Sequence, residues 1–564
     1  MNRLLIIILI PLLLMTCNSK IVKSPTLILL NGKIFTAENL MSFNEAVAIT
    51  GNTITAVGKT EDIKSLAGDS TEVIDLQGKL VIPGFNDSHI HFLNGSKGLA
   101  EVELTSTQSA EDVESYIQKY VREHINSPWI IGRGWQYTFY DGGFPTRKML
   151  DALVPDKPAY IRAYDGHTAW VNSRALELAG INKHYRFTGF GEVVKDPKGE
   201  PTGILKEDAM SLVSRLIPPK TREENLEALR LGMKLAAQLG ITSIQNAHGS
   251  VEETELFETL LANNELSLRV GVAFSIDEKT SPTDLKNFVQ VRDRIGYNNP
   301  MLRAGAVKFM IDGVIEGHTA FMLKPYSDPI PKELSPTGQV SMPLPRFGSL
   351  ITTIDSLGFQ IYTHAIGDRG VRETLNAYET AQKQNKRNDA RHRIEHIETI
   401  NPEDIPRFAQ LDVMASMEPI HAEPGTVEIW GKAIGEKRLP YSFAWNDLLK
   451  ANAKLVFSSD WPACLSLNPI RGLHVAVTRR NPQGFPENGW VPEQKITMAE
   501  ALYAYTYMGS YSSFEEKTKG KIAPGYLADV VVLSQDLFTI NPMDVHKTLV
   551  NLTVFDGKII YERK

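Results

Sequence analysis

Short apolar runs joined by turn residues occupy both ends of the chain. Each pair of runs flanks a glycine next to asparagine or aspartate, which is typical of a β-hairpin. The pairs are residues 27–30 and 33–36 around Asn31-Gly32, 46–49 and 53–57 around Gly51-Asn52, and 549–555 and 558–561 around Asp556-Gly557. Because these hairpins lie at opposite ends of the sequence, we predict one small β-sandwich domain formed from both termini, residues 25–80 and 516–564.

The middle of the chain alternates apolar strands with helical patterns. Thr221 is followed by Glu224 three positions on, which is the order of a helical capping box, and apolar residues then recur at helical spacing as far as Gly240. An apolar strand follows directly, at residues 241–245. Strands that alternate with helices over this length predict parallel strands with helical crossovers.

We therefore predict an α/β fold in which residues 81–515 form a (β/α)8 TIM-like barrel. The predicted barrel strands are residues 85–91, 241–246, 268–275, 306–311, 360–364, 393–396, 412–418 and 454–460. The gap between the first two is far longer than one helix, so residues 92–220 are predicted to be a long insertion after barrel strand 1. The insertion has strand-like runs at 129–132 and 159–163.

Residues 1–17 have the pattern of a targeting segment. Asn2-Arg3 gives a basic start, and the apolar run of residues 4–15 is shorter than the ~20 residues that span a bilayer. Leu14-Met15-Thr16-Cys17 resembles a bacterial lipoprotein signal peptide, with Cys17 as the lipidated first residue of the mature chain and residues 18–24 as a tether. This predicts a lipid-anchored protein of the bacterial cell envelope. The alternative is plain secretion after cleavage nearby.

Composition narrows the classes of function. The 564 residues carry a net charge of −6 without a basic stripe interleaved with aromatic residues, which argues against a nucleic-acid partner. Two cysteines, Cys17 and Cys464, are too few for a disulfide scaffold or a cysteine-based zinc site. The thirteen histidines are an ordinary number, so only their placement can indicate a site.

Potential metal ligands lie where the predicted barrel strands end. His89 and His91 project to the same side of the first strand, because strand side chains alternate, and two such imidazoles can share one metal ion. The other strands carry Lys308, His364, His396 and Asp460. Active groups of such barrels gather at the carboxyl ends of the strands. One shared two-metal site therefore accounts for all these residues together.

Each residue taken alone also has a purely structural interpretation. A single buried histidine is usually hydrogen-bonded in the core, and Asp460 could cap the next helix. Lys308 is unusual inside an apolar strand, because burying an unpaired ammonium group costs free energy. We expect that it either forms a salt bridge with Asp312 or Glu316 or is chemically altered.

Six motifs carry a resemblance to a known family. They are Pro-Gly-Phe-Asn-Asp-Ser-His-Ile-His at 83–91, Val-Lys-Phe-Met-Ile-Asp-Gly at 307–313, His-Thr-Ala at 318–320, His-Ala-Ile-Gly-Asp-Arg at 364–369, Arg-Ile-Glu-His at 393–396 and Ser-Ser-Asp-Trp-Pro at 458–462. Together they resemble the metal-dependent amidohydrolase superfamily, in particular amidohydrolase family 3, which includes N-substituted formamide deformylase-like proteins. The resemblance covers nearly the whole mature chain, including the split sheet domain and the insertion.

The resemblance implies a set of metal ligands. His89, His91 and Asp460 would hold a first divalent ion, and His364 and His396 would hold a second. Lys308, converted by CO2 to a carbamate (carboxylysine), would bridge the two, since a carbamate turns a buried cation into an anionic oxygen ligand. Without that modification the site would hold one ion. Zinc is the default metal for histidine-rich ligation with carboxylate oxygen.

The implied activity is hydrolysis of a non-peptide carbon–nitrogen bond of a small molecule, in an amide or an N-acyl or N-formyl group. The metal lowers the pKa of its water towards ~7, and Asp460 takes that proton and later delivers it to the leaving nitrogen. Candidate substrate-binding residues are Trp135, Asp165, His167, Asp312, Glu418, Trp461 and His421, with His248 and His318 as further histidines that could reach the pocket. Trp135 and Trp461 could equally serve packing.

Two other functions stay open from the sequence. One is cyclic-amide hydrolysis or deamination on the same metal site, and the other is a lipoprotein that binds a ligand through the metal without catalysis. The predicted partners are the small-molecule amide, the membrane through the lipid anchor and a second copy of the chain in a homodimer. No nucleic acid is expected.

Overall fold

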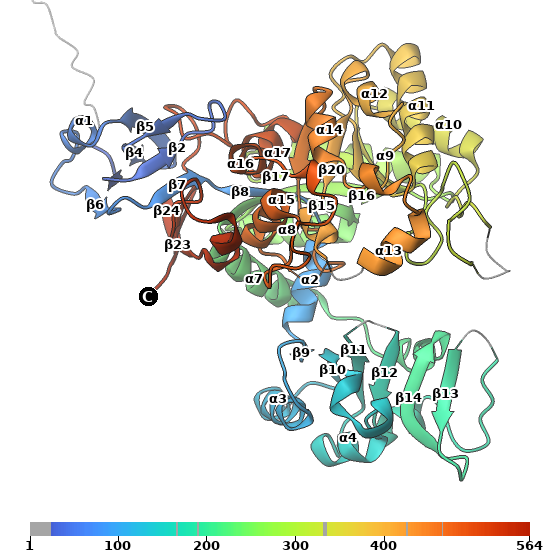
Figure 1. Cartoon of the computed structure of the whole chain (residues 1–564). Coiled ribbons are helices and arrows are strands. Elements are labelled where there is room, and N and C mark those ends of the chain that lie inside the picture. Colours follow the sequence, from blue (N-terminus) through green and yellow to red (C-terminus); the bar gives the residue numbers. More distant parts are fainter. Residues whose placement is uncertain (1–23, 165–166, 189–190, 331–334, 425–426, 465) are drawn as a thin grey trace, which may run out of the picture.

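The computed structural model describes residues 24–164, 167–188, 191–330, 335–424, 427–464 and 466–564. Its centre is a sheet of eight parallel strands, in the order β21-β20-β19-β18-β17-β16-β15-β8 (Figure 1). The strands are β8 (Phe85–Ile90), β15 (Ile241–Gly249), β16 (Arg269–Ser275), β17 (Leu302–Met310), β18 (Gln360–Ala365), β19 (Arg393–His396), β20 (Met414–Met417) and β21 (Lys454–Phe457). The predicted barrel is confirmed, although β20 and β21 are shorter than predicted.

The two outer strands of this sheet, β8 and β21, come together just past their carboxyl ends. The amide of Asp460 donates to the carbonyl of His89 at 2.8 Å, and the amide of His91 donates to the carbonyl of Trp461 at 2.9 Å. Asp460 has a positive φ of 53°, which turns the chain out of β21 at this point. Closure of the barrel therefore places His89, His91 and Asp460 next to one another.

Helices cover the outside of the barrel as crossovers between successive strands (Figure 1). They are α7 (Arg222–Gln238), α8 (Val251–Ala262), α9 (Pro282–Ile295), α10 (Leu344–Ser356), α11 (Asp368–Asn385), α12 (Ile405–Gln410) and α14 (Trp445–Lys450), with α15 (Pro469–Thr478), α16 (Met498–Tyr505) and α17 (Tyr507–Ser512) after the last strand. The capping box predicted for α7 is present, because the Thr221 hydroxyl accepts from the Glu224 amide and the Glu224 side chain accepts from the Thr221 amide. In this part of the chain, helix period and cap agree with the final fold.

Two further sheets, built from the terminal segments of the chain, pack face to face beside the barrel. One has the order β5-β4-β1-β6, and the other has the order β24-β23-β22-β7-β2-β3. The strands are β1 (Leu27–Leu30), β2 (Lys33–Phe35), β3 (Phe43–Asn44), β4 (Ala46–Thr50), β5 (Thr53–Gly58), β6 (Glu72–Asp75), β7 (Leu80–Pro83), β22 (Val530–Leu533), β23 (Val550–Phe555) and β24 (Lys558–Glu562). β22 pairs antiparallel with β7, so a β domain built from both termini is confirmed.

One predicted hairpin of this domain is wrong. β1 and β2, on either side of Asn31-Gly32, belong to different sheets and do not pair. All four residues of β1 are buried, and its edges are taken by β4, antiparallel, and β6, parallel. Asn31 adopts φ 55° and redirects the chain into the second sheet. The hairpins β4–β5 and β23–β24 form as predicted.

The insertion after β8 forms a lobe of its own, joined to the barrel through α2 (Phe92–Leu99) (Figure 1). Its sheet has the order β13-β14-β12-β11-β10-β9. The elements are β9 (Val102–Glu103), β10 (Ile130–Trp135), β11 (Ala159–Ala163), β12 (Thr168–Val171), β13 (Gly191–Lys195) and β14 (Pro201–Glu207), with α3 (Ala110–Glu123), α4 (Arg147–Leu153) and α5 (Ser173–Leu178) packed on it. Both strand-like runs predicted in the insertion are strands.

Within the described residues, no helix is long and apolar enough to cross a membrane. The predicted targeting segment and Cys17 lie outside the described residues.

Candidate metal centre

The barrel strands deliver the predicted ligands to one cavity at their carboxyl ends. This cavity has a volume of about 490 Å3, and its walls include His91, Lys308, His364, His396 and Asp460. His89 lies just behind the wall, fully buried at the end of β8. Five of the predicted ligands therefore line one cavity, and the sixth, His89, lies directly behind its wall.

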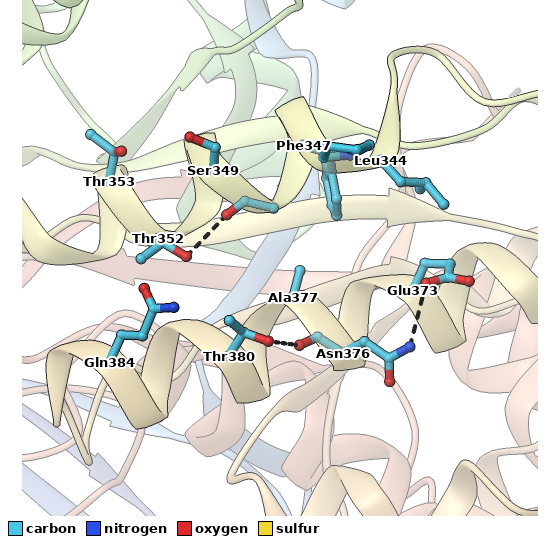
Figure 2. A pocket seen from close by; sticks show the side chains of 12 residues that line it. Leu344, Phe347, Ser349, Thr352, Thr353, Glu373, Asn376, Ala377, Thr380 and Gln384 are labelled. Carbon is cyan, nitrogen blue, oxygen red and sulfur yellow. Dashed lines mark hydrogen bonds between the residues drawn. The ribbon is translucent and has the colours of Figure 1, made fainter.

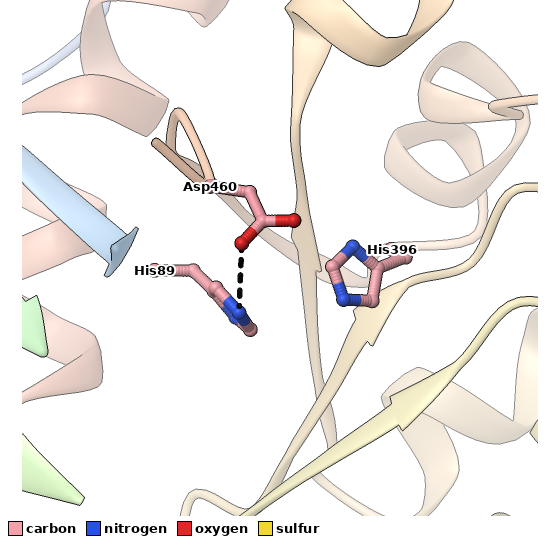
Figure 3. A group of neighbouring side chains, drawn as sticks. All are labelled: His89, His396 and Asp460. Carbon is pink, nitrogen blue, oxygen red and sulfur yellow. Dashed lines mark ion pairs between the residues drawn. The ribbon is translucent and has the colours of Figure 1, made fainter. Parts of the chain in front are cut away.

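The central contact joins Asp460 to the first two histidines. Its Oδ1 lies 3.1 Å from His91 Nε2 and 3.5 Å from His89 Nε2. Figure 3 shows His89 and Asp460 pointing toward one another, with His396 across from them. One ligand atom each from His89, His396 and Asp460 lie within 4.8 Å of one another, a separation that a single cation can bridge.

The remaining predicted ligands complete the cluster. The ring centroids of His364 and His396 are 4.4 Å apart. The Lys308 Nζ atom lies 3.2 Å from His89 Nε2, and Lys308 is buried. Among the described residues Lys308 has no ion pair with Asp312 or Glu316, so the salt-bridge alternative is not observed. Burial lowers the pKa of Lys308, against the opposing charges of Glu395, Asp460 and Glu418.

Two of the imidazoles, those of His89 and His396, contact a buried carboxylate through Nδ1. His89 Nδ1 lies 2.7 Å from Glu395 Oε2, and Arg393 donates to the other oxygen of Glu395 at 2.8 Å. His396 Nδ1 lies 2.9 Å from Glu418 Oε2. A carboxylate at Nδ1 fixes the ring so that Nε2 is free to bind a metal. Sequence analysis gave Glu395 no role and placed Glu418 at the substrate, whereas the structure puts both behind the imidazoles.

Asp312, also predicted to bind substrate, does not line the cavity but is buried beside it, where its carboxylate connects two loops. Its carboxylate accepts from the backbone amides of Phe321, Ile366 and Gly367 at 2.8–3.1 Å. Its Oδ1 is 3.6 Å from His364 Nε2. Burial raises the pKa of Asp312 to about 7, in spite of these hydrogen bonds. It therefore ties the loops after β17 and β18 together beside His364.

The donor set fits a divalent metal on two observations. Asp460 Oδ1 is a buried atom without an aligned hydrogen bond in the described part of the chain. Buried polar atoms normally have a partner, so this oxygen calls for another group. Burial also lowers the pKa of His89 and His364 well below the ordinary histidine value, assisted by the charges of Lys308 and His396. Metal ligation requires such neutral imidazoles.

Several predicted substrate residues do not reach the cavity. Trp135 is fully buried in the core of the insertion, where its indole donates to the Ile161 carbonyl at 2.9 Å. His167 is exposed on the insertion, 3.1 Å from Glu207. Trp461 packs behind the site against Gly95, where no side chain would fit. Asp165 lies outside the described residues.

Of the three further histidines, His421 and His248 line the cavity. His421 Nε2 is 3.6 Å from Asp460 Oδ2, and its Nδ1 is 3.5 Å from Glu398 Oε1. His318 instead lies 3.0 Å from Asp328 and is not part of the wall.

The walls that sequence analysis did not identify come from loops beyond the strand ends. Their apolar members are Met310, Val314, Ile366, Ile420 and Ala463, and their polar members include Glu316, Glu398, Glu423 and Cys464. Glu423 is neutralised by Arg471, whose guanidinium donates to both its oxygens at 2.6 and 2.7 Å. The one available signal was the position of residues 419–423 directly after a barrel strand.

A second groove, of about 430 Å3, lies between α10 and α11 and is chemically inert by comparison (Figure 2). The hydroxyls of Thr352 and Thr380 donate to carbonyls of their own helices. Its lining carries one carboxylate, Glu373, and no histidine. Among the described residues, the groups that could hold a metal ion all include His89 or His396 of the barrel site.

The chain is similar to known proteins over nearly its whole length. A family model described as "Amidohydrolase family" matches residues 72–561. Protein LONG AFTER FAR-RED 3 of Arabidopsis thaliana is 30% identical over 95% of this chain and 91% of its own length. N-substituted formamide deformylase of Arthrobacter pascens is 25% identical over 95% of this chain and 98% of its own. The crystal structure of an uncharacterized metal-dependent hydrolase from Pyrococcus horikoshii superposes with a TM-score of 0.71 at 26% identity, covering 92% and 99% of the two chains.

Proposed function

The chain belongs to the amidohydrolase family, and from this premise we propose that it hydrolyses an amide, N-acyl or N-formyl bond of a small molecule. Metal-dependent hydrolysis of carbon–nitrogen bonds is the family's activity and that of this chain. The finer assignment rests on one observation. Asp460 lies beside the imidazoles of His89, His91 and His421 on the wall of a cavity that is open to small molecules.

In this proposal His89, His91 and Asp460 hold one divalent ion, and His364 and His396 hold a second. Lys308, as a carbamate, would supply the bridging ligand, and its burial beside His89 supports that role. Zinc is the proposed metal because its ligands are typically imidazoles and carboxylates. When bound, such ions supply a water of lowered pKa, near ~7, and polarise the scissile carbonyl.

The proton steps belong to Asp460. Burial opposes its ionisation, but the contact with His91 and the charges of His396 and His421 outweigh burial and hold its pKa well below the usual range. An ionised carboxylate can accept a proton from the attacking water. As the water oxygen bonds to the carbonyl carbon and the carbon–nitrogen bond breaks, Asp460 returns that proton to the leaving nitrogen.

The two oxygens of Asp460 have different surroundings, which supports this assignment. Oδ1 faces His89 and His91, while Oδ2 faces His421. One oxygen can thus serve as a ligand while the other carries the proton. The apolar wall that includes Met310 and Val314, both partly exposed, offers space for an apolar substituent of the substrate.

The test compares zinc-loaded wild-type protein with the Asp460→Asn variant on N-formyl amines, N-acyl amino acids, cyclic amides and aminopurines. Loss of a general acid–base group lowers kcat by about 10²–10⁴-fold. We expect that loss on the N-formyl or N-acyl compounds, with bound metal measured separately in each protein. Asp69→Asn, an exposed carboxylate, is the matched control. Equal turnover by Asp460→Asn and wild type would disprove the mechanism, and turnover of cyclic amides or aminopurines alone would reassign the substrate.

A further inference from the structure

Another cavity lies at the amino-terminal end of the barrel, opposite the metal centre. Its volume is about 280 Å3. Strand residues Gln245, Gly271, Ala306 and Tyr362 line it, together with residues of the loops at that end. The interior of a TIM barrel is normally filled by bulky branched side chains, so an open space here needs an explanation.

The space exists because β16 and β17 place very small residues at this level. The register between the two strands shifts between Gly271 and Ala273, where β17 carries one extra residue. A Cβ atom built on Gly305 would meet no atom within 4 Å, and one on Gly271 would meet its nearest neighbour at 3.7 Å. Larger residues would fit at both positions. The small residues at these two positions therefore leave a space in an interior that proteins normally fill with side chains.

Arginine and aromatic side chains line the mouth of the cavity. The guanidinium groups are those of Arg292, Arg303 and Arg387, with one carboxylate, Glu515, in the same lining. Arg292 and Arg387 are already paired, with Asp293 at 3.0 Å and with Asp355 at 3.1 Å. Glu515 is already paired with the buried Lys519 at 3.0 Å, and Arg303 lies 3.8 Å from it. Arg303 instead donates to neutral acceptors, the carbonyls of Ser513 and Tyr297. Of the three guanidiniums, that of Arg303 is the one without a carboxylate closer than 3.8 Å among the described residues, and its charge favours an anion.

A chain of buried contacts joins this cavity to the metal centre. Gln245 accepts from Tyr362, at 3.2 Å, and from the guanidinium of Arg393, which stacks 3.5 Å from the centre of the Tyr362 ring. Arg393 donates to Glu395, which holds His89 at 2.7 Å. A ligand that displaces Gln245 or Tyr362 would therefore disturb the group that orients His89.

We propose that the cavity lined by Gly271, Gly305 and Arg303 is a binding site for a small organic anion with a flat apolar body, such as an aryl carboxylate. The apolar body fits the space over Ala306, and the carboxylate pairs with the Arg303 guanidinium at the mouth. Occupancy changes the metal affinity of the distant centre through Arg393 and Glu395. Binding at this site does not depend on the proposed hydrolytic function, whereas its effect on metal affinity rests on the metal centre proposed there.

The test uses benzoate as the probe, with benzyl alcohol as its neutral counterpart, on the zinc-loaded full-length protein. Calorimetry measures binding, and competition with a chelator measures zinc affinity, so neither readout needs turnover. We expect Gly305→Val, which fills the space, to weaken benzoate binding at least tenfold. Arg303→Met should weaken benzoate to a similar extent while leaving benzyl alcohol unchanged. Benzoate should shift zinc affinity at least twofold in wild type and not in Gly305→Val.

Gly348→Val is the matched control, since a Cβ on Gly348 also meets no atom within 4 Å but lies in the separate groove of Figure 2. It should bind benzoate as wild type does. Benzoate binding that is equal in wild type, Gly305→Val and Arg303→Met would overturn the proposal, because it would place the anion elsewhere, including at the metal centre. Binding at the cavity with no change in zinc affinity would overturn the coupling.

Discussion

At the scale of single residues, the metal centre depends on which way each imidazole turns. Glu418 is fully buried behind His396, with its other oxygen accepting from the Ser458 hydroxyl at 3.0 Å. Glutamine at this position keeps the shape of the side chain but loses the charge that fixes the ring. Partners of this kind typically contribute 10–100-fold to metal affinity.

We therefore expect Glu418→Gln to weaken zinc binding by about 10–100-fold, measured by competition with a chelator. The thermal midpoint of the metal-free protein should stay close to wild type, which separates loss of orientation from loss of fold. Glu403→Gln, whose side chain is largely exposed, serves as the control. Unchanged zinc affinity in Glu418→Gln would show that Glu418 does not orient His396.

Glu253, at the start of α8, makes stability depend on pH. Burial raises the pKa of Glu253 to about 7, against the charge of Lys97 and hydrogen bonds from Asn246 and Leu93. The folded protein thus binds a proton that the unfolded chain releases above its own lower pKa. Stability is fully present below the unfolded pKa and falls as pH rises towards 7, by up to a few kcal/mol.

The measurement is the free energy of unfolding in denaturant at pH 5 and pH 8. Glu253→Gln removes the titrating group and keeps a side chain of nearly the same shape. We expect the variant to gain stability relative to wild type between pH 5 and pH 8. A difference between variant and wild type that is the same at both pH values would rule out this assignment.

Single residues were predictable where their position along a strand decides their chemistry. His89, His91, His364, His396 and Asp460 lie at strand ends, and the barrel brings strand ends together. Glu395 was not assigned, although its Oε2 lies only 2.7 Å from His89 Nδ1. That contact joins residues 306 positions apart and depends on the sheet closing, which no local pattern encodes.

At the scale of elements, one buried ion pair fastens the terminal β domain to the barrel. Arg269, at the start of β16, donates to both oxygens of Asp529 beside β22, at 2.6 and 3.0 Å, and to Asp556 in the β23–β24 turn at 3.0 Å. Arg269 and Asp529 are both buried. Removing one member of a buried pair leaves an uncompensated charge.

We expect Arg269→Met to lower the free energy of unfolding by about 3–5 kcal/mol and to increase proteolytic cleavage near residues 516–564. Arg230→Met is the matched control, because Arg230 meets three carboxylates, one more than Arg269, but on the surface of α7, where such pairs contribute about 0–1 kcal/mol. Equal effects of the two substitutions would contradict the role of the Arg269 pair in docking.

Helices and strands were predictable where one side of the element is buried in the core and the other faces solvent. α7 shows its cap and its period plainly, and it forms as predicted. The hairpin at Asn31-Gly32 failed because β1 is buried on both faces and borrows its partners, β4 and β6, from farther along the chain. A turn motif predicts where the chain changes direction, but burial in the core decides which strands then pair with each other.

At the scale of the whole molecule, the two ends of the chain meet in one hydrophobic core. Leu29 and Val47 from one sheet pack in the same cluster as Val81 and Val532 from the other. β7, before the barrel in the sequence, pairs with β22, after it, so strands from both sides of the barrel build this domain. The insertion, in contrast, has separate cores of its own.

We propose that lipid on Cys17 tethers this whole assembly to a bacterial membrane. A lipoprotein carries more than one acyl chain, which gives stable attachment, whereas residues 4–15 are too short to span a bilayer. Cys17→Ser should therefore move the protein from the membrane fraction to the soluble fraction, without the added mass of the acyl chains. Hydrolytic activity should be unchanged, because the metal centre lies in the barrel. If the Cys17→Ser protein stays in the membrane fraction, the lipid anchor on Cys17 is refuted, and a different attachment must hold the protein there.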